Sequence, residues 1–509
     1  MFIKEGRVEE REYQKNIFDS AKDSNTLVIL PTGLGKTIIS VLMTDYRLGK
    51  FAGSKALFLA PTRPLVNQHY KTFSGIMNLD MGAVSGSTKK SDRKSLYETS
   101  QLIFATPQTI DHDIDSEIID FSDFSLLVVD EAHHTIGNYA YVKIAKKFMA
   151  YSKHAVILGL TASPASDREK IKVICDNLGI TNIEIRGEDD PDVKQYVKTK
   201  LVREIRIVLP KELQEITKSV RSLIQGQIES LQDIGLLKNA ATSKINRVTI
   251  LMLQKSLQKR MFAGNRTGYI IRGIITTSKI LKLYHALNLV STQSLESFNK
   301  FIERIIKHGT AKTDKELAKT PQFVELYETS SNLLEQGVEH PKLEKVVSIL
   351  KESLGKDKRA IIFTQYRDSV DTIFSHLRGI DGVRPIKFIG QGRGGLSQKD
   401  QINIIKDFEV GVYNVLVSTS VSEEGISIKG ADVAIFYETI PSGIRAIQRR
   451  GRVGRFDAGK IFILITENTS DEGYYWVAKR KESRMKKIIK DIKANPESLR
   501  NDGTLKGFI

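Results

Sequence analysis

The sequence predicts an α/β protein in which two parallel-sheet units flank an all-helical insertion. Short apolar runs alternate with helix-length polar segments between residues 26 and 190, and the same alternation returns from about 341 to 475. Such short, wholly apolar runs are typical of parallel strands that are buried on both faces. The repeat therefore indicates two α/β units. At roughly 150 residues per domain, 509 residues suffice for three domains that each bury a core.

Ten apolar runs are the expected strands. In the first unit they are TLVIL (26–30), ALFLA (56–60), LIFAT (102–106), LLVVD (126–130) and AVILGLTA (155–162), and in the second AIIFT (360–364), IKFI (386–389), NVLVST (414–419), VAIFYE (433–438) and KIFILIT (460–466). Between the units the strand pattern is lost, and apolar residues recur at helical spacing: Leu213, Ile216, Val220, Leu223, Leu231 and Ile234. We expect a first domain at 1–204, a helical insertion at 205–340 and a second domain at 341–509.

The charge of the chain indicates a polyanionic partner. Lys and Arg number 77 and Asp and Glu 60, which gives a net charge of +17. The stretch from Lys238 to Lys312 holds fourteen basic residues and two acids, so it carries +12 and the remaining chain +5. A second run, Lys479 to Lys493, holds eight basic residues and two acids. Each run also fits a plain solvated helix face.

Composition excludes several classes of protein. The single cysteine, Cys175, cannot form an intramolecular disulfide or a CxxC metal site, which indicates a reducing compartment. No apolar run approaches the roughly 18 residues of a membrane span, and the first residues contain no apolar signal region. We expect a soluble, cytoplasmic protein with no membrane partner.

A glycine-rich turn, LPTGLGKT (30–37), lies between the first apolar strand and a helix-like segment. Its glycines would let backbone N–H groups approach phosphate oxygens, while Lys36 can reach the β and γ phosphates and Thr37 can bind Mg²⁺. The strict form of this pattern has glycine in place of Leu30, so the segment alone also fits an ordinary glycine turn. The expected nucleotide-binding residues here are Thr32, Gly33, Gly35, Lys36 and Thr37.

Two adjacent carboxylates end a buried strand in LLVVDEAH (126–133). Asp130 is suited to hold Mg²⁺ through water, and Glu131 to orient or deprotonate an attacking water. Adjacent acids after a strand can also simply cap a helix, but here they follow a phosphate loop in the same unit. The pair is what an NTP-hydrolysing site requires.

The second unit carries an arginine-rich segment, QRRGRVGR (448–455). Guanidinium groups supplied from a second domain can stabilise charge on a transferring phosphoryl group, and Arg452 and Arg455 are the candidates. Taken alone, the segment fits nucleic-acid binding equally well. The expected catalytic set is Lys36, Asp130, Glu131, Gln448, Arg452 and Arg455.

Eight short segments, taken in their order along the chain, resemble the motif set of superfamily 2 helicases. They are PTGLGKT (31–37), APTRPLVNQ (60–68), ATPQT (105–109), DEAH (130–133), TASP (161–164), IIFTQYRDS (361–369), STSVSEEGISI (418–428) and QRRGRVGR (448–455). Within that group, the DEAH segment, the helical insertion and HPKLEKV (340–346) resemble the archaeal Hef helicase and its relatives of the Fanconi anaemia group M type. The RIG-I and Dicer helicases are similar in layout. The resemblance implies two RecA-like domains with ATP hydrolysed between them.

The resemblance also implies roles for single residues. Gln14 matches the position that reads the adenine edge, and Arg11 or a nearby aromatic matches the group that stacks on the base. Thr161 and Ser163 match a motif that links the ATP site to the nucleic-acid groove. The positions that match contacts to the nucleic-acid backbone, which give affinity without sequence preference, are Thr62, Arg63, Thr106, Gln365 and Thr419.

Two departures from the family pattern stand out. Ser427 occupies a position where the family commonly has aspartate, which puts the usual carboxylate contribution near the ribose or to interdomain coupling in doubt. The resemblance to archaeal Hef would also imply a nuclease fused to the helicase. In this sequence, however, no ERKxxxD-like acidic cluster follows Arg484. We therefore expect no nuclease in this chain.

Together these features predict an ATP- and Mg²⁺-dependent DNA helicase or translocase that remodels forks and four-way junctions. The basic insertion would grip a second duplex arm, and a separate nuclease or clamp is a candidate partner. An RNA-duplex-stimulated ATPase of the RIG-I and Dicer type is the alternative, followed by a non-catalytic DNA-binding scaffold. The expected DNA-binding residues of the insertion are Lys255, Lys259, Arg260 and Arg266.

Overall fold

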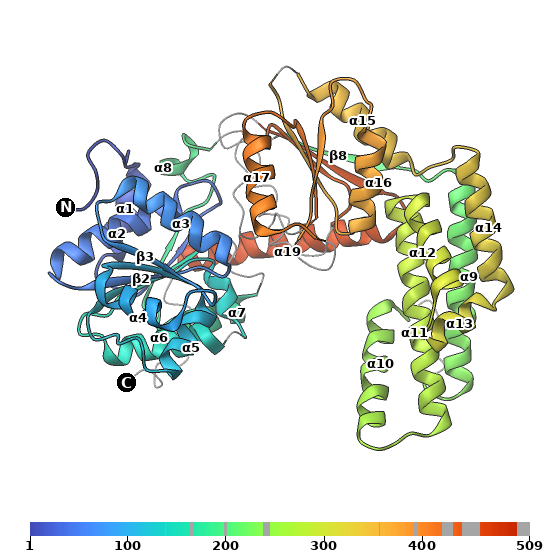
Figure 1. Cartoon of the computed structure of the whole chain (residues 1–509), viewed down its shortest axis with the longest axis horizontal. Helices are drawn as coiled ribbons and strands as arrows, with labels where there is room; N and C mark the ends of the chain where they lie inside the picture. The colour runs from blue at the N-terminus through green and yellow to red at the C-terminus, as the bar shows by residue number, and fades with distance from the viewer. Residues whose placement is uncertain are drawn as a thin grey trace.

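The computed structural model confirms two parallel-sheet domains with a helical bundle between them in sequence (Figure 1). It describes residues 1–137, 139–162, 167–197, 201–237, 245–355, 357–390, 395–419, 431–439 and 459–495. None of the helices in these ranges is both long enough and apolar enough to cross a membrane.

The first sheet has seven parallel strands in the order β3-β4-β2-β5-β6-β1-β7. Apolar cores cover both of its faces, because its central strands are buried on both sides. The strands are β1 (Thr26–Ile29), β2 (Lys55–Leu59), β3 (Met81–Val84), β4 (Leu102–Ala105), β5 (Phe124–Val129), β6 (Ile157–Thr161) and β7 (Asn182–Ile185).

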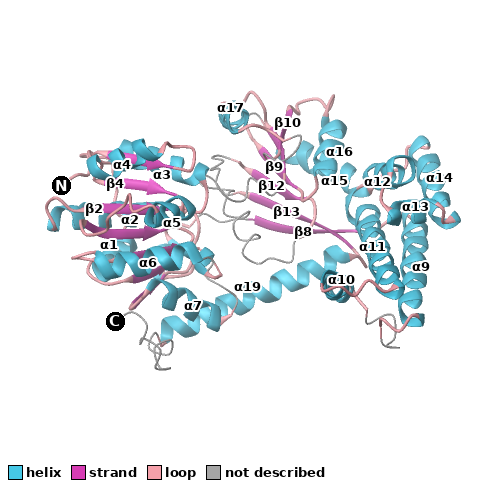
Figure 2. Cartoon of the chain, turned by 60° about the horizontal axis from the view of Figure 1, so that its bottom comes forward, coloured by secondary structure: helices cyan, strands magenta, loops and turns pink. Residues whose placement is uncertain are grey.

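Helices pack on both faces of this sheet (Figure 2). They are α1 (Glu12–Ala21), α2 (Lys36–Lys50), α3 (Arg63–Ile76), α4 (Lys90–Thr99), α5 (Pro107–Asp115), α6 (Tyr139–Tyr151), α7 (Arg168–Leu178) and α8 (Pro191–Lys194). A short 3₁₀ turn, Ala132–Thr135, follows β5.

The second sheet has six parallel strands in the order β10-β11-β9-β12-β13-β8. They are β8 (Leu201–Ile207), β9 (Ala360–Phe363), β10 (Pro385–Phe388), β11 (Val415–Ser418), β12 (Val433–Phe436) and β13 (Lys460–Thr466). Helices α15 (Pro341–Ser353), α16 (Arg367–Leu377) and α17 (Gln398–Glu409) accompany it.

All ten expected strands are present, and the structure adds β3, β7 and β8. Each of the three lies at the edge of a sheet, and β8 exposes most of its residues. Edge strands need no continuous apolar sequence, which is why the pattern missed them. Strand β8 also pairs with β13 over its whole length, so residues 201–204, which we assigned to the first domain, lie in the second sheet. The chain thus enters the second sheet before it enters the insertion.

The insertion is an all-helical bundle, as predicted. Its elements are α9 (Lys211–Asp233), α10 (Arg247–Phe262), α11 (Gly268–Asn288), a π-helical turn (Leu289–Gln293), α12 (Leu295–His308), α13 (Lys312–Ala318) and α14 (Pro321–Glu335). The predicted stripe of α9 faces the bundle core, because Leu213, Val220 and Leu231 are wholly buried there.

One long helix, α19 (Ser470–Ala494), ties the three parts together and runs from the second sheet toward the first domain (Figure 2). At its start, Ser470 Oγ donates to Asn288 Oδ1 of the bundle at 2.7 Å. At its end, Ile492 is buried in a core of the first domain and Lys493 pairs with Asp190 at 2.6 Å.

A buried ion pair holds the bundle to the second sheet. Lys342, at the start of α15, is fully buried and pairs with Asp471 of α19. Its ammonium also donates to the carbonyl of Thr292 in the π-helical turn at 2.8 Å. Tyr437, just after β12, donates to the carbonyl of Gln293 in the same turn at 2.6 Å. This network therefore requires all its members, since a buried charge without a partner is costly.

We expect Lys342→Met to lower the free energy of unfolding by about 3–5 kcal/mol, because it leaves the Asp471 carboxylate buried without its cation. Urea denaturation followed by circular dichroism measures this. Lys300→Met is the matched control: Lys300 forms an exposed i,i+4 pair with Glu296, worth about 0.3–0.5 kcal/mol. Equal losses in the two variants would contradict the assigned role of the buried pair.

Candidate nucleotide and nucleic-acid site

The predicted site residues of the first domain lie along one edge of its sheet. Five neighbouring strands, in the order β4-β2-β5-β6-β1, end there. Thr106 follows β4, Thr62 follows β2, Asp130 follows β5, Thr161 ends β6, and the glycine loop follows β1. The carboxyl edge of a parallel sheet is where ligands of such folds bind.

The glycine loop is held in shape by helix α1. Tyr13 is wholly buried, and its hydroxyl donates to the carbonyl of Leu34 at 2.6 Å. The Gln14 amide donates to the same carbonyl at 3.3 Å and accepts from the Arg11 N–H at 3.1 Å. Arg11 itself packs over the Tyr196 ring at 4.7 Å. In this structure, then, Tyr13, Gln14 and Arg11 support the loop; base recognition by Gln14 or Arg11 stays a prediction.

Two glycines of the loop are required by its backbone. Gly33 and Gly35 have φ of 90° and 77°, a region that other residues rarely adopt. A Cβ on Gly35 would also lie 2.4 Å from Nε2 of Gln14. Lys36 begins α2 and donates to the carbonyl of Leu30 at 3.1 Å, so its ammonium lies over the loop.

Asp130 is a buried carboxylate with an unexpected partner. Nε2 of His69, on α3, lies 2.8 Å from its Oδ2, and both side chains are nearly inaccessible. Burial alone would raise the pKa of Asp130, but the hydrogen bond and charge of His69, together with the charge of Lys36, lower it below its usual value. Asp130 is therefore ionised, and it lies near enough to Lys36 for the charges to interact.

Hydrogen bonds link the carboxylate segment to the glycine loop through Thr161. Nδ1 of His133 lies 3.1 Å from Oγ1 of Thr161, and the N–H of Leu30 donates to the Thr161 carbonyl at 3.0 Å. Burial, and then the charge of neighbouring His134, lower the pKa of His133 to about 3, so this imidazole is neutral. Glu131 adopts φ of 50°, and its carboxylate lies 3.4 Å from Nδ1 of His133.

These residues fit a magnesium nucleotide. The loop presents glycine backbone and a lysine to phosphates, and Thr37 and Asp130 carry the hard oxygen atoms that Mg²⁺ prefers. Within the described ranges, no cluster of three or more His, Cys, Asp or Glu side chains could hold a metal alone.

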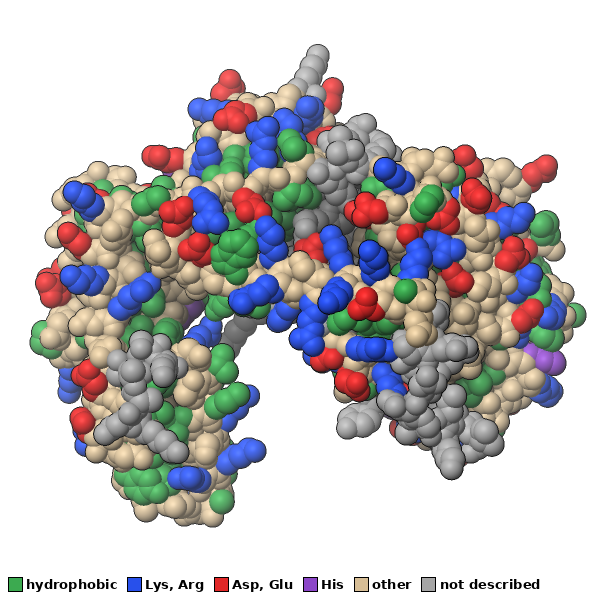
Figure 3. Space-filling model, turned by 180° about the vertical axis from the view of Figure 1, so that it is seen from behind, with side chains coloured by type: hydrophobic (Ala, Val, Ile, Leu, Met, Phe, Trp, Pro, Cys, Tyr) green, Lys and Arg blue, Asp and Glu red, His purple; other side chains and the backbone are tan. Residues whose placement is uncertain are grey.

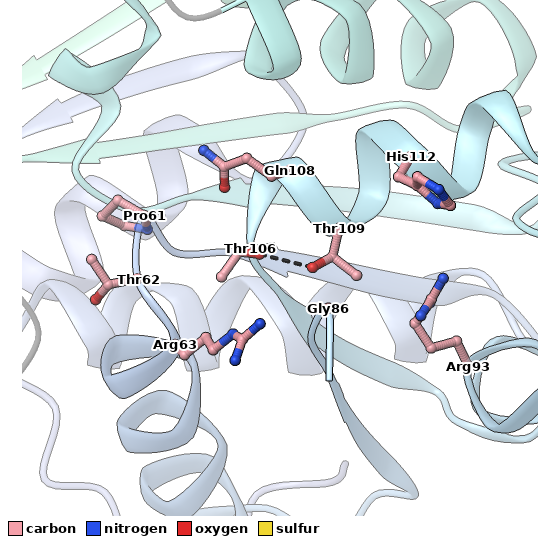
Figure 4. A pocket seen from close by; sticks show the side chains of 9 residues that line it. All are labelled: Pro61, Thr62, Arg63, Gly86, Arg93, Thr106, Gln108, Thr109 and His112. Atoms are coloured by element: carbon pink, nitrogen blue, oxygen red, sulfur yellow. Dashed lines mark hydrogen bonds between the residues drawn. The ribbon is translucent and has the colours of Figure 1, made fainter. Parts of the chain in front are cut away.

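Beside this site lies a pocket of about 520 Å³ that contains the expected nucleic-acid residues of the first domain (Figure 4). Arg63, which begins α3, is exposed, and its guanidinium would lie 3.2 Å from a Cβ on Gly86. Thr106 and Thr109 share a hydrogen bond of 2.9 Å between their hydroxyls. The full lining is Pro61, Thr62, Arg63, Gly86, Arg93, Thr106, Gln108, Thr109 and His112.

The structure describes two expected site residues of the second domain, at the matching edge of its sheet. Gln365 follows β9; its backbone N–H donates to Glu438, and its side chain reaches the Thr439 carbonyl at 3.5 Å. Thr419 follows β11 and is buried. The remaining expected residues, Ser163, Ser427, Gln448, Arg452 and Arg455, lie outside the described residues.

His69 is the residue that sequence reasoning missed. The matched motif APTRPLVNQ ends one position before it, at Gln68. Nothing in the sequence shows that α3 turns this imidazole toward the end of β5, because β2 and β5 become neighbours only in the sheet. His69 connects the helix that begins at Arg63 to the carboxylate of the nucleotide site.

A phosphate loop and a carboxylate pair on one parallel sheet, with a second such sheet after an inserted bundle, define a superfamily 2 helicase. Three family models match accordingly: "Type III restriction enzyme, res subunit" at 7–166, a model for the helical bundle of ATP-dependent RNA helicases at 212–330, and "Helicase conserved C-terminal domain" at 341–457.

Relatives identify the branch of that superfamily. The crystal structure of the Pyrococcus furiosus Hef helicase domain is 37% identical, with a TM-score of 0.72 over 94% of this chain and 99% of that one. A Methanocaldococcus jannaschii protein named as an ATP-dependent RNA helicase is 41% identical over 96% of this chain and 62% of its own length. The Mus musculus Fanconi anemia group M protein homolog is 31% identical over 96% of this chain and 26% of its own. The chain belongs to the Hef and Fanconi anaemia group M family, and it spans between a quarter and about three fifths of these two curated relatives.

We expect His69→Ala to lower the free energy of unfolding by about 1–3 kcal/mol, because the variant leaves a buried carboxylate without its hydrogen-bond partner. Urea denaturation measures the change. His376→Ala is the control: its side chain is exposed on α16, so a change within about 0.5 kcal/mol is expected. A His69 variant as stable as the His376 variant would show that the His69–Asp130 contact contributes nothing.

Proposed function

We propose that this chain is an ATP-dependent DNA helicase or translocase that acts on branched DNA such as forks and four-way junctions. The observation that carries the proposal is the continuous row of contacts along the edge of the first sheet. It runs from the glycine loop through Thr161 and His133 to the carboxylates, and from Asp130 through His69 to the helix that borders the pocket. A motor needs such a connection between its nucleotide and its track.

In the proposed mechanism, the chain's own groups divide the work of hydrolysis. Lys36 and the loop N–H groups bind the phosphates, Thr37 and Asp130 would hold Mg²⁺, and Glu131 orients or deprotonates the attacking water. Mg²⁺ would neutralise developing charge on the phosphates. Arg452 and Arg455 would complete the site from the second domain, so that closure of the two domains permits hydrolysis.

The nucleic-acid track would run over the pocket of the first domain. Thr62, Arg63 and Thr106 there, together with Gln365 and Thr419 of the second domain, would bind the phosphate backbone without reading sequence. Thr161, with Ser163, would transmit the state of the nucleotide to that track.

The insertion supplies the argument for a branched substrate. Lys279, Lys282, Lys300, Arg304 and Lys307 form ion pairs within the fold. In the described part of the chain, six other cations between the start of α10 and the first turns of α11 form no ion pair: Arg247, Lys255, Lys259, Arg260, Arg266 and Arg272. The α10–α11 hairpin projects from the bundle (Figure 1), so these cations would be available to bind a second segment of DNA beyond the track.

An RNA-duplex-stimulated ATPase remains the second candidate. The Methanocaldococcus jannaschii relative carries an RNA helicase name, whereas a Schizosaccharomyces pombe relative, 32% identical over 91% of this chain, is named an ATP-dependent DNA helicase. ATPase stimulation by DNA forks and by RNA duplexes of equal length separates the two. A chain that releases no phosphate with either would be the non-catalytic scaffold.

We expect Lys36→Ala to abolish ATP turnover and to leave DNA binding largely intact, because the lysine contacts phosphates of the nucleotide and not the track. Phosphate release with and without a DNA fork, together with fork binding by fluorescence anisotropy, measures both effects. Phosphate release at the parent rate would reject the assignment of the nucleotide site.

We expect the quadruple variant Lys255→Ala, Lys259→Ala, Arg260→Ala and Arg266→Ala to flatten the dependence of log K on log salt for a labelled fork. Each lost phosphate contact lowers the slope by about 0.9. Binding to the fork should weaken more than binding to a single strand. Titrations at several salt concentrations decide the matter, and identical slopes for parent and variant would contradict DNA binding by the insertion.

A further inference from the structure

The exposed face of α10 combines apolar and basic side chains in one stripe. Val248, Met252, Lys255, Lys259 and Phe262 follow one another at spacings of four, three, four and three, which places them on one side of an α-helix. We call these five residues the α10 stripe. All are exposed, with Phe262 at 84%, Met252 at 67% and Val248 at 56%.

The α10 stripe is not part of the core of the fold. The opposite face of α10 contributes Ile250 and Leu257 to the bundle, and these are buried. Gly273 of α11 allows that face to pack closely, since a Cβ there would lie 2.9 Å from Leu257 and 2.3 Å from Leu236. Helix α10 therefore packs on the bundle through the face that carries Ile250 and Leu257. Nothing in the described fold covers the opposite face, which carries the α10 stripe.

The chemistry around the α10 stripe selects an anionic partner. Residues 245–295 contain no Asp or Glu. Within the described ranges, the cations of α10, of the connecting loop and of the first turns of α11 form no ion pair, whereas Lys279 and Lys282 farther along α11 pair with acids of α13. Tyr269, which is 44% exposed at the start of α11, adds a second aromatic ring near the tip. Figure 3 shows basic and hydrophobic side chains interspersed along one edge of the α10–α11 hairpin. This edge faces a hollow between the hairpin and the first domain.

We infer that the α10 stripe is a contact surface for unpaired bases at the branch point of a DNA substrate. A DNA duplex offers phosphates to the lysines, but it hides the faces of its bases and would leave Phe262 and Met252 in water. Unpaired nucleotides present both a charged backbone and a π face, and proteins bind them with cations and exposed apolar rings together. The stripe extends about 21 Å along α10, long enough to follow a strand and not a single base.

This inference rests on the proposed function, because it assumes that DNA is the track. It adds that the insertion distinguishes unpaired bases from duplex, which the basic residues alone cannot do. An acidic protein partner is the other occupant that a basic, apolar surface could take, and the experiment treats it as an outcome.

The test compares Met252→Ala/Phe262→Ala with the parent chain on two labelled substrates of equal length, a fork with single-stranded arms and a blunt duplex. We expect the double variant to bind the open fork about fivefold or more weakly, the factor that corresponds to the loss of one stacked base. This factor should be the same at every salt concentration, since no charge is removed. Duplex binding should be unchanged.

Two control variants test whether the effect is specific to the α10 stripe. Val410→Ala removes an equally exposed apolar side chain, 77% accessible, from the end of α17 in the second domain, and it should bind both substrates as the parent does. Phe262→Trp keeps an aromatic ring at this position, so it should bind the open fork as tightly as the parent chain does. In a Trp476→Phe background, the fluorescence of the new tryptophan should be quenched by the open fork and not by the duplex. Trp476 is the chain's one natural tryptophan, so this background removes the only competing signal.

Several outcomes would overturn the inference. Unchanged fork affinity in the double variant, or equal loss on fork and duplex, would show that the stripe touches no bases and would leave an acidic protein as its occupant. Because the quadruple basic variant reports DNA binding separately, such a failure leaves the proposed function standing. A parent chain that binds no DNA and hydrolyses no ATP would instead remove the proposed function, and this inference with it.

Discussion

The parallel arrangement of the first sheet is the constraint on which the described chemistry depends. Parallel strands end at a common edge, and the order β4-β2-β5-β6-β1 places side chains distant in sequence side by side there. Hydrogen bonds then join neighbours along that edge: Leu30 to Thr161, Thr161 to His133, and Asp130 to His69. These bonds connect the glycine loop to the carboxylate segment, and Asp130 to the helix that borders the pocket. The row of contacts is therefore a property of the sheet, built from ordinary contacts between adjacent strand ends.

A second constraint is the way in which the helical bundle is attached to the second sheet. The chain crosses into the second sheet at β8 before it builds the bundle, and it returns to that sheet at α15, so the bundle is attached at both of its ends. Lys342, Asp471 and the π-helical turn fill that junction with buried polar groups, each of which needs its partner. The bundle and the second sheet should thus behave as one unit. Helix α19 then reaches the first domain through buried Ile492 and the partly exposed Lys493–Asp190 pair, which together impose less directional geometry than the buried Lys342–Asp471 pair.

Sequence reasoning predicted what depends on local pattern and missed what depends on neighbours. Central strands are apolar on both faces and were all found, whereas β3, β7 and β8 are edge strands with mixed sequences such as LVREIRI. The glycine loop and the carboxylate pair could be found because their chemistry lies in consecutive residues. His69 could not, since its role arises only when β2 and β5 pair. The support that Tyr13 gives to Leu34 across 21 positions was equally invisible to a linear pattern.

The number of charged residues could be read from the sequence, but the ion pairs that they form could not. The sequence places fourteen cations between Lys238 and Lys312, but it cannot say which are neutralised. In the fold, acids of α12, α13 and α16 pair with five of them: Lys279 and Lys282 in the second half of α11, and three cations of α12. Among the described residues, the cations of α10, of the connecting loop and of the first turns of α11 form no ion pair, and they lie on the hairpin that projects from the bundle (Figure 1). There they are interleaved with the exposed apolar side chains of Met252 and Phe262. A single exposed apolar residue is ordinary on a protein surface, but here several lie in one stripe with cations. This combination matches the charged backbone and the π face that unpaired nucleotides present together, which is why we infer that partner.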